Sequence, residues 1–91
     1  TIERALGELP GVRAACVVGV PDPRWGMRPV AFVDLLHPPA QPVRDALAAL
    51  LERHLVPDAV YAMPADEAAK MKPSRAALAA RLAAGESFEP R

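Results

Sequence analysis

The 91-residue sequence is poor in residues that small proteins use to build cross-links and phosphate sites. Cys16 is the only cysteine, so an internal disulfide is excluded and we expect a reducing, cytoplasmic location. The five glycines are too scattered to form a phosphate-binding loop. No run of about 18 apolar residues is present, so we expect no membrane span. These absences argue against a disulfide-held scaffold, a nucleotide-binding domain and a membrane protein.

Charge and histidine content exclude two further classes of site. Eleven basic residues balance eleven acidic ones, which gives a net charge of +0 and removes the electrostatic case for a nucleic-acid partner. His37 and His54 have no Cys, His or Asp partners at metal-ligand spacing, so we expect no metal site. The hydrophobic content of 52% nevertheless predicts a packed domain. As a free-standing enzyme, the chain has almost no catalytic residues.

Prolines are abundant, 11 against 5 glycines, and they separate short predicted elements. Apolar spacing predicts a helix over residues 2–9 and a buried strand over residues 12–20 that Pro21 ends. A turn at residues 22–26 leads to a second strand over residues 30–36. Because this connection is short, we expect the two strands to pair antiparallel.

The second half of the sequence continues with a helix, a strand and a helix. The apolar pattern predicts a helix over residues 43–55 and a strand over residues 59–63. Pro73 is expected at the first helical position of a last helix, and Gly85 at its C-terminal cap. The element order is therefore α-β-β-α-β-α. The fold class is α+β, a small three-stranded, mainly antiparallel sheet with helices packed on it, in a single domain over residues 1–91.

Three sequence segments occur together in an order that is typical of one enzyme superfamily. They are CVVGVPD at residues 16–22, the pair Trp25-Gly26, and RPVAFV at residues 28–33. This succession resembles the C-terminal subdomain of AMP-forming acyl-CoA synthetases, a superfamily that also contains peptide-synthetase adenylation domains. The resemblance extends over residues 2–82. It implies a mobile lid whose large N-terminal, ATP-binding and acyl-binding domain is absent from this chain.

The resemblance also implies a catalytic lysine near the end of the chain. In the family this lysine has an arginine three residues later and a leucine six residues later. Lys72 fits that register with Arg75 and Leu78, whereas Lys70 does not. The family's glycine before the lysine is replaced by Met71, which keeps Lys70 as the second choice. Lys72 is thus the implied adenylation residue.

The sequence around Lys72 gives it a setting that helix stability does not explain. A residue before proline is pushed towards extended backbone, so Lys72 is expected to project from a non-helical segment ahead of Pro73. A positive charge at a helix N-terminus is slightly unfavourable, so Lys72 does not serve the helix. The alternative interpretation is an ordinary solvated surface lysine.

Trp25, Gly26 and Arg28 are candidates for a face that meets the large domain or CoA. For Trp25 we favour the alternative that the indole covers the edge of the sheet and bonds to backbone. Arg28 is undecided between an ion pair near the turn and a contact with a CoA phosphate.

The implied function is a two-step ligation by the complete enzyme. ATP and a small carboxylic acid give acyl-AMP and pyrophosphate, and CoA then attacks the acyl-AMP. The implied cofactors are ATP/AMP with Mg²⁺ and CoA, and the implied partner is the chain's own N-terminal adenylation domain. The ending KPSRAAL at residues 72–78 is similar to o-succinylbenzoate–CoA ligases. The 91 residues alone are expected to be inactive.

Two other functions stay open. The lid of a peptide-synthetase adenylation domain would serve a carrier protein instead of CoA. A non-enzymatic α+β interaction module would bind a protein, and it predicts that Lys72 is dispensable.

Overall fold

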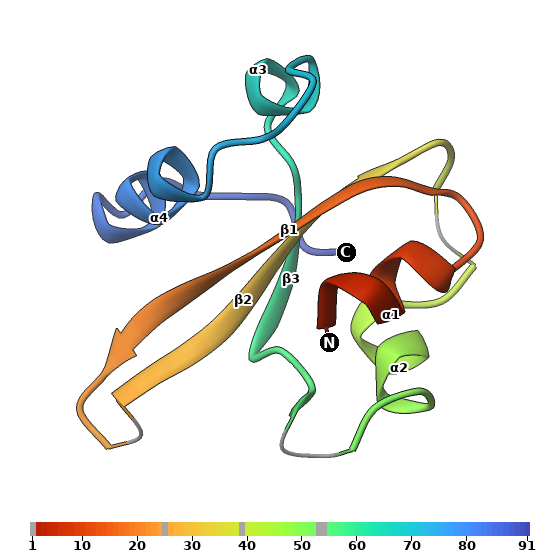
Figure 1. The fold of residues 1–91 in the computed structure, drawn as a ribbon, viewed down its shortest axis with the longest axis horizontal. Coiled ribbons are helices and arrows are strands. Elements are labelled where there is room, and N and C mark those ends of the chain that lie inside the picture. Colours follow the sequence, from red (N-terminus) through yellow and green to blue (C-terminus); the bar gives the residue numbers. More distant parts are fainter. Residues whose placement is uncertain (1, 25, 39, 53–54) are drawn as a thin grey trace.

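The computed structural model describes residues 2–24, 26–38, 40–52 and 55–91, and within them helices flank a three-stranded sheet (Figure 1). In chain order the elements are α1 (Ile2–Glu8), β1 (Val12–Asp22), β2 (Gly26–Leu35), α2 (Val43–Ala48), β3 (Ala59–Ala62), α3 (Ala65–Ala68) and α4 (Arg75–Ala83). This arrangement confirms the α+β class and the predicted order, with the short α3 added before the last helix. Within the described ranges, no helix is long and apolar enough to cross a membrane.

The sheet is mixed, with the strands in the order β1-β2-β3. β1 and β2 form an antiparallel hairpin that runs from Val12↔Leu35 to Asp22↔Gly26, as predicted. β3 pairs parallel with β2, with Val30 opposite Ala59. The second pair is parallel because the chain crosses over through α2 before β3 begins, and a short turn cannot make this connection.

Several predicted boundaries differ from the structure. β1 continues through Pro21 to Asp22, since β1 is an edge strand and tolerates the missing amide donor. The helix predicted over residues 43–55 ends at Ala48. Leu50 and Leu55 are 53% and 41% exposed, so the apolar pattern does not continue into the core there.

The last helix begins after Pro73 and ends as predicted. Ser74 is its N-cap and accepts a hydrogen bond from the Ala77 amide at 3.1 Å, so Pro73 precedes the helix and does not occupy its first position. Gly85 has φ +84°, and the amides of Gly85 and Glu86 return to the carbonyls of Leu82 and Arg81. This is the Schellman geometry that favours glycine after a helix.

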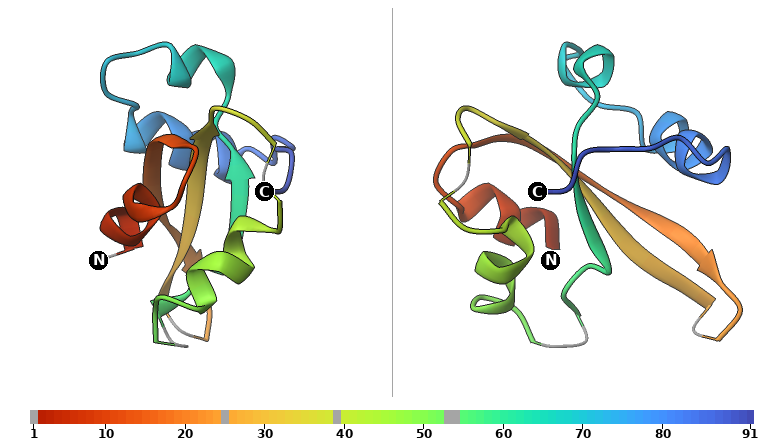
Figure 2. Two further views of the ribbon diagram at one scale, coloured as in Figure 1. Left: turned by 90° about the vertical axis from the view of Figure 1, so that its right-hand side faces the viewer. Right: turned by 180° about the vertical axis from the view of Figure 1, so that it is seen from behind.

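Two apolar clusters lie on opposite faces of the sheet. Alternation along β2 directs Ala31 and Val33 to one face and Val30 and Phe32 to the other. The first face, here the α1/α2 face, has the buried cluster Ala5, Leu6, Ala31, Val33, Val43, Leu47 and Val60. The second, the α4 face, has Cys16, Val18, Val30, Phe32, Met63 and Leu78. Figure 1 and the rear view in Figure 2 show α1 and α2 on one side of the strands and α4 on the other.

The C-terminal segment, residues 89–91, lies along the outer edge of β3. The Ala62 amide donates to the Glu89 carbonyl at 2.7 Å, and the Arg91 amide donates to the Val60 carbonyl at 2.8 Å. The Arg91 carbonyl also accepts from the amide of Val43 at 2.8 Å. The segment thereby joins β3 to the start of α2.

Candidate functional site

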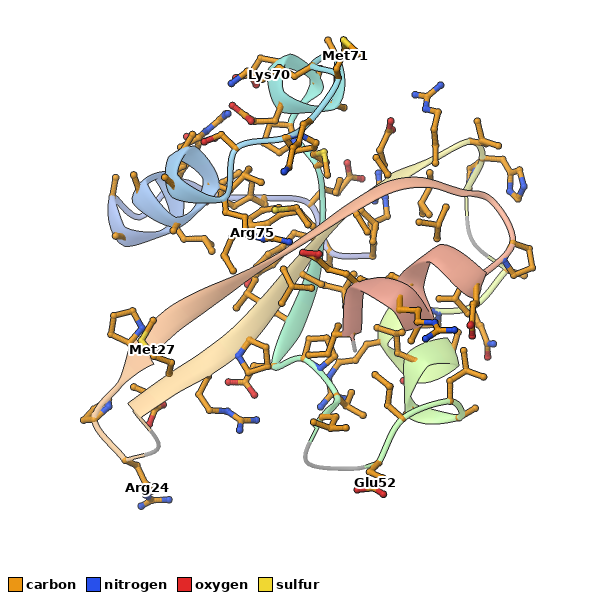
Figure 3. All side chains as sticks on the ribbon, in the orientation of Figure 1. Arg24, Met27, Glu52, Lys70, Met71 and Arg75 are labelled. Carbon is orange, nitrogen blue, oxygen red and sulfur yellow. The ribbon has the colours of Figure 1, made fainter. Side chains whose placement is uncertain are left out.

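The loop between α3 and α4, residues 69–74 (the lysine loop), lies at one end of the molecule (Figure 3). Lys70 and Lys72 are the only lysines in the 91-residue sequence, so both of its ammonium groups are here. Both residues are exposed, and Met71 between them is fully exposed. An exposed methionine has no packing reason to lie at this position, so the loop projects into solvent as a free edge of the domain.

A buried carboxylate, that of Glu67, binds two residues of the lysine loop. The side chain of Glu67 is 3% exposed, and its Oε2 accepts a hydrogen bond from Lys70 Nζ at 2.6 Å. Its Oε1 accepts from the Ser74 amide at 2.8 Å. The bond from Lys70 and then the bond from Ser74 lower the pKa of Glu67 and outweigh the opposing effect of burial. One charged carboxylate therefore binds the Lys70 side chain before Lys72 and the Ser74 backbone amide after it.

The structure gives the two lysines different surroundings. Lys70 is committed to Glu67, as described above. Among the residues that the structure describes, Lys72 makes no ion pair, although at longer range its charge helps to lower the pKa of Glu3. The ammonium group of Lys72 is therefore the one available to a ligand without breaking an existing contact.

A shallow cavity of about 310 Å³ lies beside Lys72 and Pro73. Its other walls include Glu3 and Arg75, whose guanidinium Nη2 donates to both carboxylate oxygens of Glu3. Glu3 also accepts from the Val17 amide at 3.2 Å, and the bond from Arg75 is the main cause of its lowered pKa. Arg75 thus pairs with a carboxylate of α1.

Cys16 lies against the same cavity but belongs to the hydrophobic core. It is 3% exposed, and burial raises the pKa of its thiol. A thiol that resists deprotonation is a poor nucleophile at neutral pH, so Cys16 acts as a small apolar residue, as expected from its place in a buried strand.

A second ionic cluster joins α3 to α4. The Arg81 guanidinium binds Asp66 at 3.0 Å and Glu86 at 2.6 Å, and lies 5.8 Å from the centre of the Phe88 ring. Bonds to Arg81 lower the pKa of both carboxyl groups. The helices on either side of the lysine loop are therefore tied directly to each other.

The β1–β2 hairpin tip, at residues 22–26, carries the other predicted site residues. Gly26 has φ +80°, a left-handed conformation that side chains disfavour, and the carboxylate Oδ1 of Asp22 accepts from the Arg24 amide at 2.8 Å. Asp22 and Gly26 are the last pair of the hairpin ladder. Trp25 lies outside the described residues.

Arg28 is engaged within the domain. Its Nη2 donates to Asp58 Oδ1 at 2.7 Å, and its Nε lies 3.1 and 3.2 Å from the two carboxylate oxygens. The bond from Arg28 is the main cause of the lowered pKa of Asp58. Of the two roles left open by the sequence, the ion pair near the turn is the one present in this structure, and it joins the start of β2 to the segment before β3.

The predicted site residues do not converge. Figure 3 shows Arg24 and Met27, which flank the hairpin tip, at one end of the molecule and Lys70 and Met71 at the other. The described ranges contain no group of three or more His, Cys, Asp or Glu residues that could hold a metal ion. Sequence reasoning missed Glu67, and the available signal was an acidic residue three positions before Lys70 on a helix.

Known structures resemble this fold closely. A variant of E. coli MenE with bound OSB-AMS shares 27% identity with a TM-score of 0.75, and covers 89% of this chain. Wild-type E. coli MenE with a phenylether-linked analogue of OSB-AMS shares 26% identity with a TM-score of 0.74 over 91% of this chain. A fatty acyl CoA synthetase from Mycobacterium tuberculosis shares 25% identity with a TM-score of 0.69 over 94% of this chain.

In each case this chain spans only 18% of the length of the solved one. No curated protein sequence gives a significant match. The family model described as the AMP-binding enzyme C-terminal domain matches residues 1–72, which is most of the sequence and reaches into the lysine loop. The chain therefore belongs to the family of AMP-binding enzyme C-terminal domains.

Proposed function

We propose that this chain is the mobile C-terminal domain of an AMP-forming carboxylate–CoA ligase and that Lys72 acts in its adenylation step. The observation that carries the proposal is the lysine loop. It presents one exposed ammonium group without an ion pair among the described residues, on a loop in which Glu67 binds the Lys70 side chain and the Ser74 amide. Membership of the family and the likeness to MenE and to a fatty acyl CoA synthetase support the same reaction class.

In the adenylation step a carboxylate oxygen forms a bond to the α-phosphorus of ATP, and pyrophosphate leaves. Two anionic groups must approach each other, so negative charge accumulates where the new bond forms. Lys72 would lie between the carboxylate and phosphate oxygens and neutralise part of that charge, which is electrostatic stabilisation of the transition state. ATP and its Mg²⁺ would be held by the N-terminal domain, which this chain does not include.

In the second step, after the domain has turned and withdrawn Lys72, the CoA thiol would attack the acyl carbonyl carbon of acyl-AMP, the acyl–phosphate bond would break, and AMP would leave. In Figure 3 the lysine loop and the hairpin tip lie at opposite ends of the molecule, which supports a separate surface of the domain for each half-reaction. Gly26 and Arg28, together with Trp25, are the candidates for the second face. A CoA phosphate could bind Arg28 only by sharing it with Asp58, so the role of Arg28 there would be secondary.

For the acid, we propose o-succinylbenzoate. The ending KPSRAAL at residues 72–78 resembles that group of ligases, and the MenE structures carry OSB-AMS and an analogue of it. The acyl pocket would belong to the N-terminal domain, so the 91 residues alone would be inactive. A cytoplasmic location is part of the same proposal.

The test compares the wild-type complete protein with its Lys72→Ala variant in both half-reactions. The exchange of pyrophosphate into ATP reports the adenylation step. We expect it to fall by about 100-fold or more, because the variant lacks a charge that stabilises the transition state. Thioester formation from supplied acyl-AMP should be largely kept. A parallel Lys70→Ala variant removes the other lysine of the same loop, and a larger loss of exchange there than in Lys72→Ala would assign the adenylation role to Lys70. Full exchange activity in Lys72→Ala would refute the proposal.

The alternative acceptor is a carrier protein, as in peptide-synthetase adenylation domains. Supplying the acyl-AMP form of the complete protein with either CoA or a pantetheine-bearing carrier separates the two functions. A binding module without enzymatic activity would show neither exchange nor transfer, and Lys72 would be dispensable for its binding.

A further inference from the structure

We infer that Glu67 is a positioning residue for the adenylation step, which holds Lys72 at the reaction centre by fixing the lysine loop. The inference rests on the proposed function of Lys72. Glu67 would touch neither ATP nor the acid, and would act only through the backbone that carries Lys72.

The contacts of Glu67 are symmetrical about Lys72. Lys70, bound to Oε2, lies two residues before Lys72, and the Ser74 amide, bound to Oε1, lies two residues after it. Only residues 71–73 remain between the two attachment points. Within them Pro73 has a fixed φ, which removes a further backbone rotation next to Lys72. The catalytic candidate therefore lies between a residue that Glu67 holds by its side chain, Lys70, and one that it holds by its backbone amide, Ser74.

Packing fixes only the end of this segment. Met71 and Lys72 are exposed, whereas Pro73 is half-buried and lines the cavity. A lysine in a loosely packed loop loses conformational entropy each time it is aligned with a substrate. A loop that is already ordered before substrate arrives avoids that cost, and small misplacements of a catalytic group reduce rates strongly. The two bonds of Glu67 supply the order that packing does not.

Domain stability alone does not explain why a glutamate is buried at position 67. Glu67 is the only charged or polar side chain among the described residues that is fully buried. Burying a carboxylate is unfavourable unless it is paired, and an apolar residue of similar size often stabilises a fold as well or better. A buried carboxylate directed at a solvent-exposed loop is therefore better explained by the loop than by the core.

Asp66 provides a matched control on the same short helix. It is the adjacent acidic residue, but its carboxylate binds Arg81 on α4 and makes no bond to the lysine loop. Asp66→Ala removes a charge and weakens the contact between α3 and α4, while the anchors of the loop stay in place. Glu67→Ala removes both anchors.

The experiment measures both half-reactions in the complete protein for Glu67→Ala, Glu67→Gln and Asp66→Ala. We expect Glu67→Ala to lower pyrophosphate exchange by roughly 10-fold or more, in kcat and not in KM for ATP. Glu67→Gln should recover part of that loss, because its amide oxygen can still accept from the Ser74 amide. Thioester formation from supplied acyl-AMP should stay unchanged in all three variants. Loss of both half-reactions would show a structural role and overturn the inference.

A double-variant cycle separates action through Lys72 from a general effect. In a Lys72→Ala background, Glu67→Ala should lower exchange no further, because the group that it positions is gone. An equal further loss would overturn the inference. If Lys72→Ala abolishes exchange and Glu67→Ala leaves it intact, only the inference fails. If Lys72→Ala leaves exchange intact, the proposed function fails and the inference falls with it.

A third measurement reads the loop directly. Because this sequence has lysines only at positions 70 and 72, a lysine-specific protease can cut these 91 residues only in the lysine loop. Cleavage after Lys70, followed by mass spectrometry of the complete protein, should be several-fold faster in Glu67→Ala than in wild type or Asp66→Ala. Equal rates in all three proteins would show that Glu67 does not order the loop.

Discussion

The two faces of the sheet are held together by different forces. On the α1/α2 face, aliphatic side chains such as Leu6, Val33 and Leu47 are almost completely buried and pack against each other. On the α4 face, an aromatic group adds to the apolar cluster, with the rings of Phe32 and Phe88 4.9 Å apart in an edge-to-face arrangement.

Several charged contacts surround the second of these apolar clusters. Arg75 binds Glu3, Arg81 binds Asp66 and Glu86, and Lys70 binds Glu67. Lys70, near the start of the lysine loop, belongs to one of these ion pairs, and Arg75, directly after the loop, belongs to another. The position of the loop therefore depends on charge state and salt, whereas the α1/α2 face depends mainly on apolar burial.

The largest expected effect comes from a matched pair of leucines, one on each face. Leu47 and Leu78 are both 0% exposed, and replacing either with alanine should destabilise the domain by about 2–5 kcal/mol. Only Leu78→Ala should also lower pyrophosphate exchange beyond the loss of folded protein, because it shifts α4 and the lysine loop. Amide hydrogen exchange of peptides from this domain measures the loss of stability, and pyrophosphate exchange measures the loss of activity. Equal losses of activity per folded molecule would contradict the contrast between the faces.

The next largest effect is a loss of α4 stability at acidic pH. Ion pairs lower the pKa values of Glu3, Glu67 and Glu86 below the ordinary 4.5, and that of Asp66 below 3.8. Their contribution to stability is complete above those ordinary values and is lost as the pH falls through the lower folded values. Amide protection factors in α4 should therefore drop more than those in α2 between pH 5 and about pH 3. An equal fall in the protection factors of α2 and α4 would contradict the contrast between the two faces of the sheet.

The smallest effect is expected from Arg75→Lys. Lysine keeps the charge but is shorter and lacks the planar guanidinium, whose Nη2 donates to both carboxylate oxygens of Glu3. Since the Arg75 side chain is 60% exposed, the loss of α4 protection should be several-fold smaller than for Leu78→Ala, and it should disappear at high salt. A loss that persists in molar salt would mean that packing of the Arg75 stem matters more than its charge.

The sequence predicted those features that depend on local patterns. Apolar spacing identified the two strands of the hairpin, and Gly85 identified the end of α4. The length of α2 was wrong, because residues 49–52 lie where the chain must turn back towards β3, and their apolar spacing does not show this. The parallel pairing of β3 likewise follows from the crossover and not from any residue in the strand.

The candidate site also depends on both local and long-range features. The spacing of Lys72 from Arg75 and Leu78, and the proline after Lys72, are local, so both lysines could be proposed as candidates from the sequence. Glu67 was not proposed, because its role depends on Lys70 and Ser74 reaching the two oxygens of one side chain from opposite ends of a loop. Whether Arg28 binds Asp58 or a ligand also depends on the strand crossover that brings residues 30 positions apart into contact.

The segment at residues 89–91 has a consequence for the solubility of the domain. β3 is the outermost strand of the sheet, and its free amides and carbonyls would form a template for another chain if they were uncovered. The bonds from Ala62 to Glu89 and from Arg91 to Val60 cover that edge. A protein shortened after Phe88 would expose it and should self-associate through edge-to-edge pairing. Three residues that contribute little to the core would thus shield this edge of the sheet from other chains.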